Sequence, residues 1–253
     1  MTERAEMDED TELIEDTRAT TASRPLVPVV VFPGSNDDRD AQLALERLGA
    51  ESPRVWHTER ALPAGTAAVV LPGGFSYGDY LRCGAIARFS PVLEAVTDFA
   101  AGGGLVLGIC NGFQILTEAG LLPGTLRPNE SLSFICRDVT LTVERTDTPF
   151  STRCEDGRPI TVPVKHGDGC YFADEDLLGE LEENRQIVLR YGDGENLNGS
   201  VADIAGVVNA EGNVFGLMPH PEHAVDSELG STDGALILGS LVDAARLSLG
   251  APV

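Results

Sequence analysis

Lysine is almost absent from this chain: Lys165 is the single lysine among 18 basic residues. Acidic residues number 40, so the formal net charge is -22. A surface of this sign repels phosphate backbones and anionic bilayers, which makes nucleic acid and membranes poor candidate partners. An acidic excess with arginine in place of lysine also indicates adaptation to high salt, where screening weakens the self-repulsion of the chain. We therefore expect a halophilic protein.

Targeting segments, paired cysteines and nucleotide-binding loops are also missing. No apolar run approaches the roughly 20 residues of a membrane-spanning helix, and the acidic N-terminus does not have the form of a secretory signal. The five cysteines include no Cys-x-x-Cys pair, which argues against a disulfide framework and a structural zinc site. Neither Gly-x-x-x-x-Gly-Lys-Ser/Thr nor Gly-x-Gly-x-x-Gly occurs. We expect a cytoplasmic protein that holds no cofactor in this chain.

The apolar pattern predicts one α/β domain. Residues 1–24 lack periodic apolar positions and are predicted to be a disordered acidic extension, which leaves residues 25–253 as the domain. Strands alternate with helices as far as residue 121, which indicates an open, mainly parallel sheet with helices on both faces. The expected strands are 26–32, 54–57, 67–74 and 105–107, and the expected helices lie near 41–48, 86–100 and 113–121.

After Leu126 the pattern changes to alternating apolar and polar residues, which predicts an antiparallel insertion. The expected elements are strands 135–143, 160–164 and 186–191, a hairpin of 204–208 with 213–218, and a closing helix at 233–249. Ligands bind at the carboxyl ends of strands in open α/β sheets. Pro33-Gly34, Gly73-Gly74 and Cys110 all fall at such ends.

Cys110 stands at the apex of a strand–turn–helix segment, with Gly108 and Gly112 two residues away on either side. The nucleophile elbow of hydrolases has this form, because its glycines let two backbones pass closely while the apex residue is held in a strained conformation. A thiol at this point faces a helix N-terminus, which favours the thiolate. Cysteine is also among the most buried residue types, so a core cysteine is the alternative. The two glycines favour the nucleophile.

A cysteine nucleophile needs a base and a group that orients the base. His220 follows an apolar strand and has proline on both sides, which predicts a rigid, non-helical loop. Glu222 lies two residues further on, and in extended backbone this spacing puts both side chains on one face. We therefore predict that Cys110, His220 and Glu222 form a catalytic triad.

His220, Glu222 and His223 also imitate a metal site of two histidines and one carboxylate. The prolines exclude the helical His spacing of common zinc motifs, and no other His or Cys pair has a credible ligand spacing, so no metal is expected. His166 lies in a glycine-rich loop and is a candidate for a substrate or partner contact.

Acyl chemistry further needs donors for a developing oxyanion. The backbone amide of Asn111, directly after the nucleophile and at a helix start, is one natural donor. Gly73-Gly74, at the end of a neighbouring strand, supplies backbone without side chains and is the candidate for the second donor.

Longer motifs add a family resemblance. Gly108–Gln114, together with the distant His220-Pro-Glu222, resembles the class I (triad) glutamine amidotransferases. Three more segments resemble the glutaminase subunit I, of PurQ type, of phosphoribosylformylglycinamidine synthases: Phe32–Asn36, Pro72–Arg88 and Asn196–Val208. The resemblance covers essentially residues 26–247, and Pro72–Arg88 is its most specific part.

The resemblance implies a flavodoxin-like fold and a glutaminase. Cys110 would attack the side-chain amide of glutamine to give a glutamyl thioester and ammonia, His220 would carry the protons, and Glu222 would orient His220. Gln114 and the Gly73-Gly74 loop would help to hold substrate and oxyanion. The ammonia would pass to a PurL-type synthetase subunit, which holds ATP and Mg and converts formylglycinamide ribonucleotide to the amidine in purine synthesis. A small PurS-type subunit is the other expected partner.

The sequence departs from this family at two positions near the predicted site. Lys165 stands where a small residue is common, and His223 stands where arginine is frequent; the 1–24 extension is also additional. Two alternatives to the glutaminase subunit stay open, namely a stand-alone thiol hydrolase on the same sheet and a non-catalytic scaffold that keeps the fold.

High-salt adaptation is directly testable. Because millimolar salt leaves the charge of -22 unscreened, we expect the chain to lose structure at low salt and to regain it as salt is added. Circular dichroism across a salt titration measures this, and full folding in millimolar salt would contradict the prediction.

Overall fold

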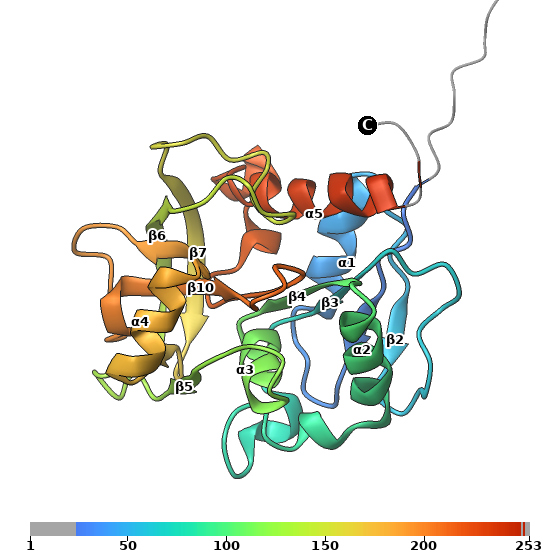
Figure 1. The fold of residues 1–253 in the computed structure, drawn as a ribbon, viewed down its shortest axis with the longest axis horizontal. Coiled ribbons are helices and arrows are strands. Elements are labelled where there is room, and N and C mark those ends of the chain that lie inside the picture. Colours follow the sequence, from blue (N-terminus) through green and yellow to red (C-terminus); the bar gives the residue numbers. More distant parts are fainter. Residues whose placement is uncertain (1–23, 249, 251–253) are drawn as a thin grey trace, which may run out of the picture.

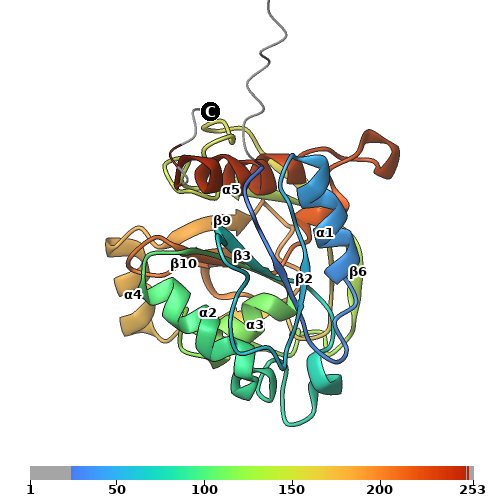
Figure 2. The same cartoon turned by 90° about the vertical axis from the view of Figure 1, so that its right-hand side faces the viewer.

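A nine-stranded sheet organises the molecule. The computed structural model describes residues 24–248 and 250, so all but the last residue of the predicted 1–24 extension lies outside the described part. The strand order is β2-β1-β3-β4-β11-β10-β9-β6-β7, and a separate two-stranded sheet pairs β5 with β8. Figures 1 and 2 show the large sheet running through the middle of the molecule, with helices above and below it.

The first five strands of this order are parallel to one another, as the sequence predicts. They are β2 (Arg54–Trp56), β1 (Val29–Val31), β3 (Ala68–Leu71), β4 (Leu105–Ile109) and β11 (Val214–Leu217). Their side chains are largely buried, because helices cover both faces, although Arg54 and Trp56 of the edge strand β2 are exposed. The register pairs Leu71 with Gly108 and Leu217 with Ile109. Three carboxyl ends therefore meet beside Cys110.

The remaining four strands are antiparallel and extend the same sheet. They are β10 (Ile204–Val208), β9 (Ile187–Tyr191), β6 (Ile135–Val143) and β7 (Ile160–His166). The predicted insertion is thus a continuation of the main sheet at the β11 edge. The small sheet of β5 (Thr125–Arg127) and β8 (Cys170–Phe172) was not predicted, because neither strand lies in a long apolar run or in a stretch of alternating apolar and polar residues.

Helices lie on both faces of the sheet, as predicted. Both views show α1 (Asp38–Arg47) and α5 (Gly234–Ser248) on one face, and α2 (Pro91–Ala101) and α3 (Asn111–Glu118) on the other. The helix expected near 86–100 begins only at Pro91, because Ser90 is held extended by the proline that follows it. A short helix beside the antiparallel strands, α4 (Glu175–Glu183), was not predicted. Within the described residues, no helix combines the length and apolar character needed to cross a membrane.

Close packing at the start of α3 depends on glycine. A Cβ on Gly112 would lie 2.0 Å from the backbone oxygen of Leu71, and a Cβ on Gly108 would lie 2.5 Å from Leu116 and 2.7 Å from Gly112. Neither glycine has a positive φ, so the requirement is one of space. The glycines on either side of Cys110 allow α3 to lie directly against β3 and β4.

Replacing Gly112 by alanine tests this packing. Because the new methyl group meets backbone that cannot move aside, we expect Gly112→Ala to destabilise the fold by about 3 kcal/mol or more. Gly179→Ala is the matched control, since its Cβ would meet nothing within 4 Å in helix α4. We expect this control to stabilise the protein by about 1 kcal/mol, as alanine does in exposed helices. Urea unfolding of both variants measures the difference, and equal stabilities would contradict the packing argument.

Candidate active site

Cys110 occupies the turn between β4 and α3 in a strained conformation. Its φ of 51° and ψ of -104° lie outside the regions that side-chain-bearing residues favour. Backbone hydrogen bonds fix the turn on both sides: the Cys110 amide donates to Leu217 at 2.8 Å, and its carbonyl accepts from Gln114 at 3.1 Å. The thiol points toward β7 and donates to the Lys165 carbonyl at 3.9 Å. The structure therefore has the geometry that the sequence predicts for an elbow nucleophile.

His220 and Glu222 meet as predicted, although the backbone that joins them differs from the expectation. Nδ1 of His220 lies 2.6 Å from Oε1 of Glu222, and both side chains are fully buried. The pairing was expected from an extended, non-helical loop, but Pro221–His223 forms one turn of 3-10 helix. Proline is favoured at the first position of a helical turn, which accounts for the difference. Nε2 of His220 has no hydrogen-bond partner among the described residues.

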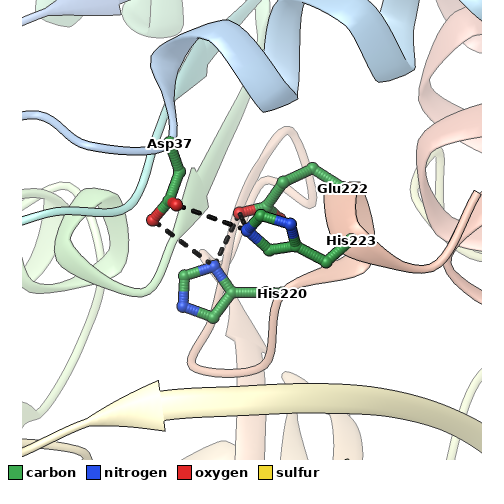
Figure 3. Close-up of side chains that lie close together, drawn as sticks. All are labelled: Asp37, His220, Glu222 and His223. Atoms are coloured by element: carbon green, nitrogen blue, oxygen red, sulfur yellow. Dashed lines mark hydrogen bonds and ion pairs between the residues drawn. The ribbon is translucent and has the colours of Figure 1, made fainter. Parts of the chain in front are cut away.

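A second carboxylate belongs to this cluster and was not predicted. Oδ2 of Asp37 lies 3.7 Å from Nδ1 of His220, and Oδ1 of Asp37 lies 3.3 Å from Nε2 of His223. The ammonium group of Lys165 also forms an ion pair with Asp37. Figure 3 shows Asp37, from the segment before α1, facing the two histidines and Glu222. Asp37, Glu222 and His223 thus lie around the His220 imidazole, and Lys165 pairs with Asp37.

The charges around His220 determine its protonation. Burial alone would lower the pKa of the imidazole, but the Glu222 carboxylate and the Cys110 sulfur raise it to about 10. The imidazole is therefore protonated at neutral pH. Burial also raises the pKa of the Asp37 carboxyl, yet the bond from His223 and the charges of His220 and Lys165 outweigh it and hold that pKa well below its usual range. An imidazolium between two carboxylates suits a thiolate partner.

A cavity of about 200 Å³ opens beside the thiol. Its walls include four of the residues that the sequence singles out: Gly74, Cys110, Gln114 and His166. Asp79 and Asp168 also face it. Burial, together with the nearby charge of Asp168, raises the pKa of Asp79. The cavity is therefore an acidic pocket with a nucleophile in its wall.

Asn111 and Gln114 connect three segments around this cavity. The Asn111 side chain accepts from the Ser76 amide at 3.1 Å and donates to Oε1 of Gln114 at 2.8 Å. Gln114 in turn donates to the Asp168 carbonyl at 2.7 Å. The predicted role of Asn111 concerns its backbone amide at the start of α3, and the bonds of its side chain escaped prediction. Both side chains fix the loops that shape the cavity.

Gly73 and Gly74 lie at the carboxyl end of β3, next to the cluster. A Cβ on Gly73 would lie 2.4 Å from Oδ2 of Asp37 and 2.6 Å from Cε1 of His220, so only glycine leaves room for both. The Gly73 carbonyl accepts from the amides of Asn36 and Asp37, each at 3.2 Å. Gly74 has a φ of +142° and lines the cavity. Gly74 thus lines the same cavity as the thiol, and the Gly73-Gly74 backbone remains the candidate for a second oxyanion donor.

His166 has one satisfied and one free ring nitrogen. The Asn129 amide group donates to the carbonyls of Ser133 and His166, each at 2.9 Å. Its Oδ1 therefore accepts from Nδ1 of His166 at 3.0 Å, which leaves Nε2 unprotonated. Burial, assisted by the charge of His220, lowers the pKa of His166 to about 4. Nε2 has no partner among the described residues, and the ring lines the cavity, so it offers an acceptor to a bound molecule.

Asp37, His220, Glu222 and His223 also offer a donor set for a metal ion. One ligand atom from each of them lies within 4.8 Å of all the others. The imidazole nitrogen that a metal would need is bound to Glu222 at 2.6 Å, and Asp37 is already paired with the cationic Lys165. In this arrangement the side chains of His220 and Lys165 supply the positive charge that a metal ion would otherwise bring to the carboxylates. The expectation that the site holds no metal remains a prediction.

Three residues of the site, Asp37, Asp79 and Asp168, escaped prediction. Asp37 follows the Pro33-Gly34 turn at the carboxyl end of β1, so the rule that ligands bind at this edge of the sheet was the available signal. The other two lie in loops that only the folded chain brings to the thiol.

Comparison with known proteins places this geometry in a family. A family model described as a CobB/CobQ-like glutamine amidotransferase domain matches residues 24–233. The chain is 55% identical over 221 residues to phosphoribosylformylglycinamidine synthase subunit PurQ of Bradyrhizobium diazoefficiens, covering 84% of this chain and 95% of that protein. It is 56% identical over 223 residues to the same subunit of Salinibacter ruber, covering 85% and 94%. The chain belongs to the PurQ family of glutamine amidotransferases.

A solved structure agrees with this assignment. The chain matches one chain of the structure of PurLQS from Thermotoga maritima with a TM-score of 0.80 and 46% sequence identity. The match covers 87% of this chain and 99% of that chain. These matches confirm the family resemblance and the α/β fold class that were inferred from the sequence.

The buried, neutral His166 makes the stability of this PurQ-family chain depend on pH. Its pKa is lower in the folded chain than in the unfolded chain, so the unfolded state binds the proton first as pH falls. We expect the wild-type chain to lose about 1 kcal/mol relative to His166→Gln between pH 7.5 and pH 5.5. Urea unfolding of both proteins at the two pH values measures the difference. A difference that does not change with pH would show that His166 is not held neutral.

Proposed function

We propose that this chain is the glutaminase subunit of a phosphoribosylformylglycinamidine synthase and that Cys110, His220 and Glu222 are its catalytic residues. The observation that carries the proposal is the strained Cys110 elbow beside a buried His220–Glu222 pair, in a chain of the PurQ family. The thiol, the base and the orienting carboxylate come from parts of the chain that lie far apart in sequence. A scaffold without catalysis has no need for such a convergence of buried charge.

The chemistry follows from the protonation of the pair. The Cys110 thiolate attacks the side-chain carbonyl carbon of glutamine and forms a C–S bond, while the C–N bond breaks. His220 donates the Nε2 proton to the leaving nitrogen, so ammonia departs and a glutamyl thioester remains. The neutral imidazole then takes a proton from water, whose oxygen forms a C–O bond with the thioester carbon. The C–S bond breaks, which releases glutamate and restores the Cys110 thiolate and the His220 imidazolium. Glu222 holds Nδ1 and stabilises the imidazolium in both steps.

The negative charge on the carbonyl oxygen needs donors during attack. We assign the backbone amides of Asn111, at the start of α3, and of Gly74, which lines the cavity, to this role. Gln114 contacts the cavity from α3 and belongs to the substrate-binding wall. Gly73 acts by leaving room for His220 and Asp37.

The cavity suits glutamine in its charge. The Asp79 and Asp168 carboxylates match an α-ammonium group, and bound ammonium would relieve the repulsion that raises the pKa of Asp79. The free Nε2 of His166 is the assigned acceptor for a substrate N–H.

The ammonia serves a second subunit in this proposal. The relative from Bradyrhizobium diazoefficiens is a synthase subunit, and the Thermotoga maritima structure is of PurLQS. A PurL-type synthetase subunit, with a small PurS-type subunit, would use ATP and Mg to convert formylglycinamide ribonucleotide to the amidine. This reaction of purine biosynthesis belongs in the cytoplasm, where we place the chain.

Ammonia release tests the proposal. We expect glutamine to yield glutamate and ammonia with the wild-type chain in complex with its synthetase subunits, and Cys110→Ala to lower this rate at least a thousandfold, since the nucleophile is lost. Cys136→Ala is the matched control, because Cys136 is exposed and lies outside the walls of this cavity, and it should leave the rate unchanged. Mass spectrometry should place a glutamine-like electrophile on Cys110.

Three outcomes separate the alternatives. Equal ammonia release with and without the synthetase subunits would favour a stand-alone hydrolase. No release from the wild-type complex would favour a scaffold. Activity that survives in Cys110→Ala would refute the assigned nucleophile.

A further inference from the structure

The Asp37 side chain does not make the hydrogen bond that is usual for an aspartate at the start of a helix. Asp37 is the N-cap residue of α1, where an aspartate side chain normally accepts a hydrogen bond from the first turn of the helix. Here the side chain makes no capping bond. The carboxylate is turned away from the helix and is 3% exposed, facing His220, His223 and Lys165 instead. A stabilising local interaction is therefore absent, and the charge is directed at the site.

The two oxygens of Asp37 have different neighbours. Oδ1 accepts from the Lys165 ammonium group and from Nε2 of His223. Oδ2 lies 3.7 Å from Nδ1 of His220, on the same ring nitrogen that Glu222 binds at 2.6 Å. Figure 3 shows the Asp37 carboxylate and Glu222 both facing that ring. Lys165 and His223 thus converge on one carboxylate.

We propose that Asp37 is a second positioning carboxylate for His220 and that Lys165 sets how strongly its charge acts on the imidazole. The inference rests on the proposed function, in which protonated His220 delivers the proton to the leaving nitrogen. Asp37 does not touch the substrate in this scheme. It favours the imidazolium over the neutral ring, and Lys165 opposes it through partial neutralisation of the same carboxylate.

The groups that face His220 come from four parts of the fold. Cys110 lies beside it at the elbow, Glu222 and His223 in the 3-10 turn, Asp37 at the start of α1, and His166 on β7; Lys165, also on β7, acts through its ion pair with Asp37. The negative groups are the Glu222 and Asp37 carboxylates, and the fixed positive group is Lys165. His166 is neutral, since burial lowers its pKa to about 4. Removing Asp37 or Lys165 therefore changes the local charge in opposite directions.

The test compares Asp37→Asn with Lys165→Met in the full chain, assayed in complex with the synthetase subunits. The alkaline limb of kcat/KM for glutamine reports loss of the imidazolium proton. We expect Asp37→Asn to move this limb about one pH unit toward acid, a roughly tenfold loss of kcat/KM on the limb. Lys165→Met should move it toward alkali. If the Asp37–Lys165 ion pair only stabilised the fold, the two substitutions would change the pH profile in the same way.

Two further variants control the comparison. Asp38→Asn makes the same substitution one residue along, where the carboxylate bonds Arg54 at 3.0 Å, and should leave the profile unchanged. Asp37→Glu keeps the charge and should keep the limb near its wild-type position.

The protonation of His220 can also be measured directly, so that the test does not depend on the proposed function. The chain has only four histidines, so an NMR titration of the labelled imidazoles resolves His220 in the isolated chain. Its midpoint should fall in Asp37→Asn and rise in Lys165→Met, even if the wild-type complex releases no ammonia.

Several results would overturn the inference. One is a His220 titration midpoint that does not change in Asp37→Asn. Another is a midpoint that moves in the same direction in Asp37→Asn and Lys165→Met. Should Asp37→Asn fail to fold, an unchanged midpoint in Lys165→Met, whose side chain is 30% exposed, would have the same force. A metal ion that co-purifies with the isolated chain in a one-to-one ratio and is lost in Asp37→Asn would show that the cluster holds a metal, and would also overturn the inference.

Discussion

The close approach of α3 to the ends of β3 and β4 is the constraint on which the site depends. It requires glycine at 112, because any Cβ there would meet the Leu71 carbonyl at 2.0 Å. The same approach holds Cys110 at a φ of 51°, since its amide is bound to β11 while its carbonyl belongs to α3. Parallel register then brings the carboxyl ends of β3, β4 and β11 to one place. The strain on the thiol is a consequence of packing, and the neighbouring strands maintain it.

Buried charge is the second feature, and it is stable because the charges balance. Three ionisable groups with almost no exposure, Asp37, His220 and Glu222, would each be costly alone. Each has an opposite charge within hydrogen-bond or ion-pair distance, and Lys165 supplies a further cation. The arrangement keeps the imidazole protonated against its burial. The stability of the fold and the protonation of the imidazole thus depend on the same contacts, so removing one partner affects both.

The sequence predicted those residues of the site that are distinguished by their immediate neighbours in the chain. The Gly–x–Cys–x–Gly spacing identified Cys110, and the prolines around His220 identified its partner, although a 3-10 turn replaced the expected extended loop. The parallel strands were equally visible, because buried strands are short apolar runs. Asp37 was not visible, since its contact with Lys165 spans 128 residues and its N-cap position offers an ordinary local role. Contacts between distant loops depend on register and packing, which no local pattern encodes.

The use of the single lysine fits the chemistry of the cluster. Elsewhere in the described structure arginine serves as the partner of carboxylates, and it binds both oxygens of Glu118 and of Asp243 through Arg82 and Arg153. A planar guanidinium at position 165 would tend to bind Asp37 in the same two-pronged way. An ammonium group is a compact point charge, so it can take one oxygen and leave the other to His220. A chain that otherwise replaces lysine with arginine therefore has a physical reason to keep lysine at this position.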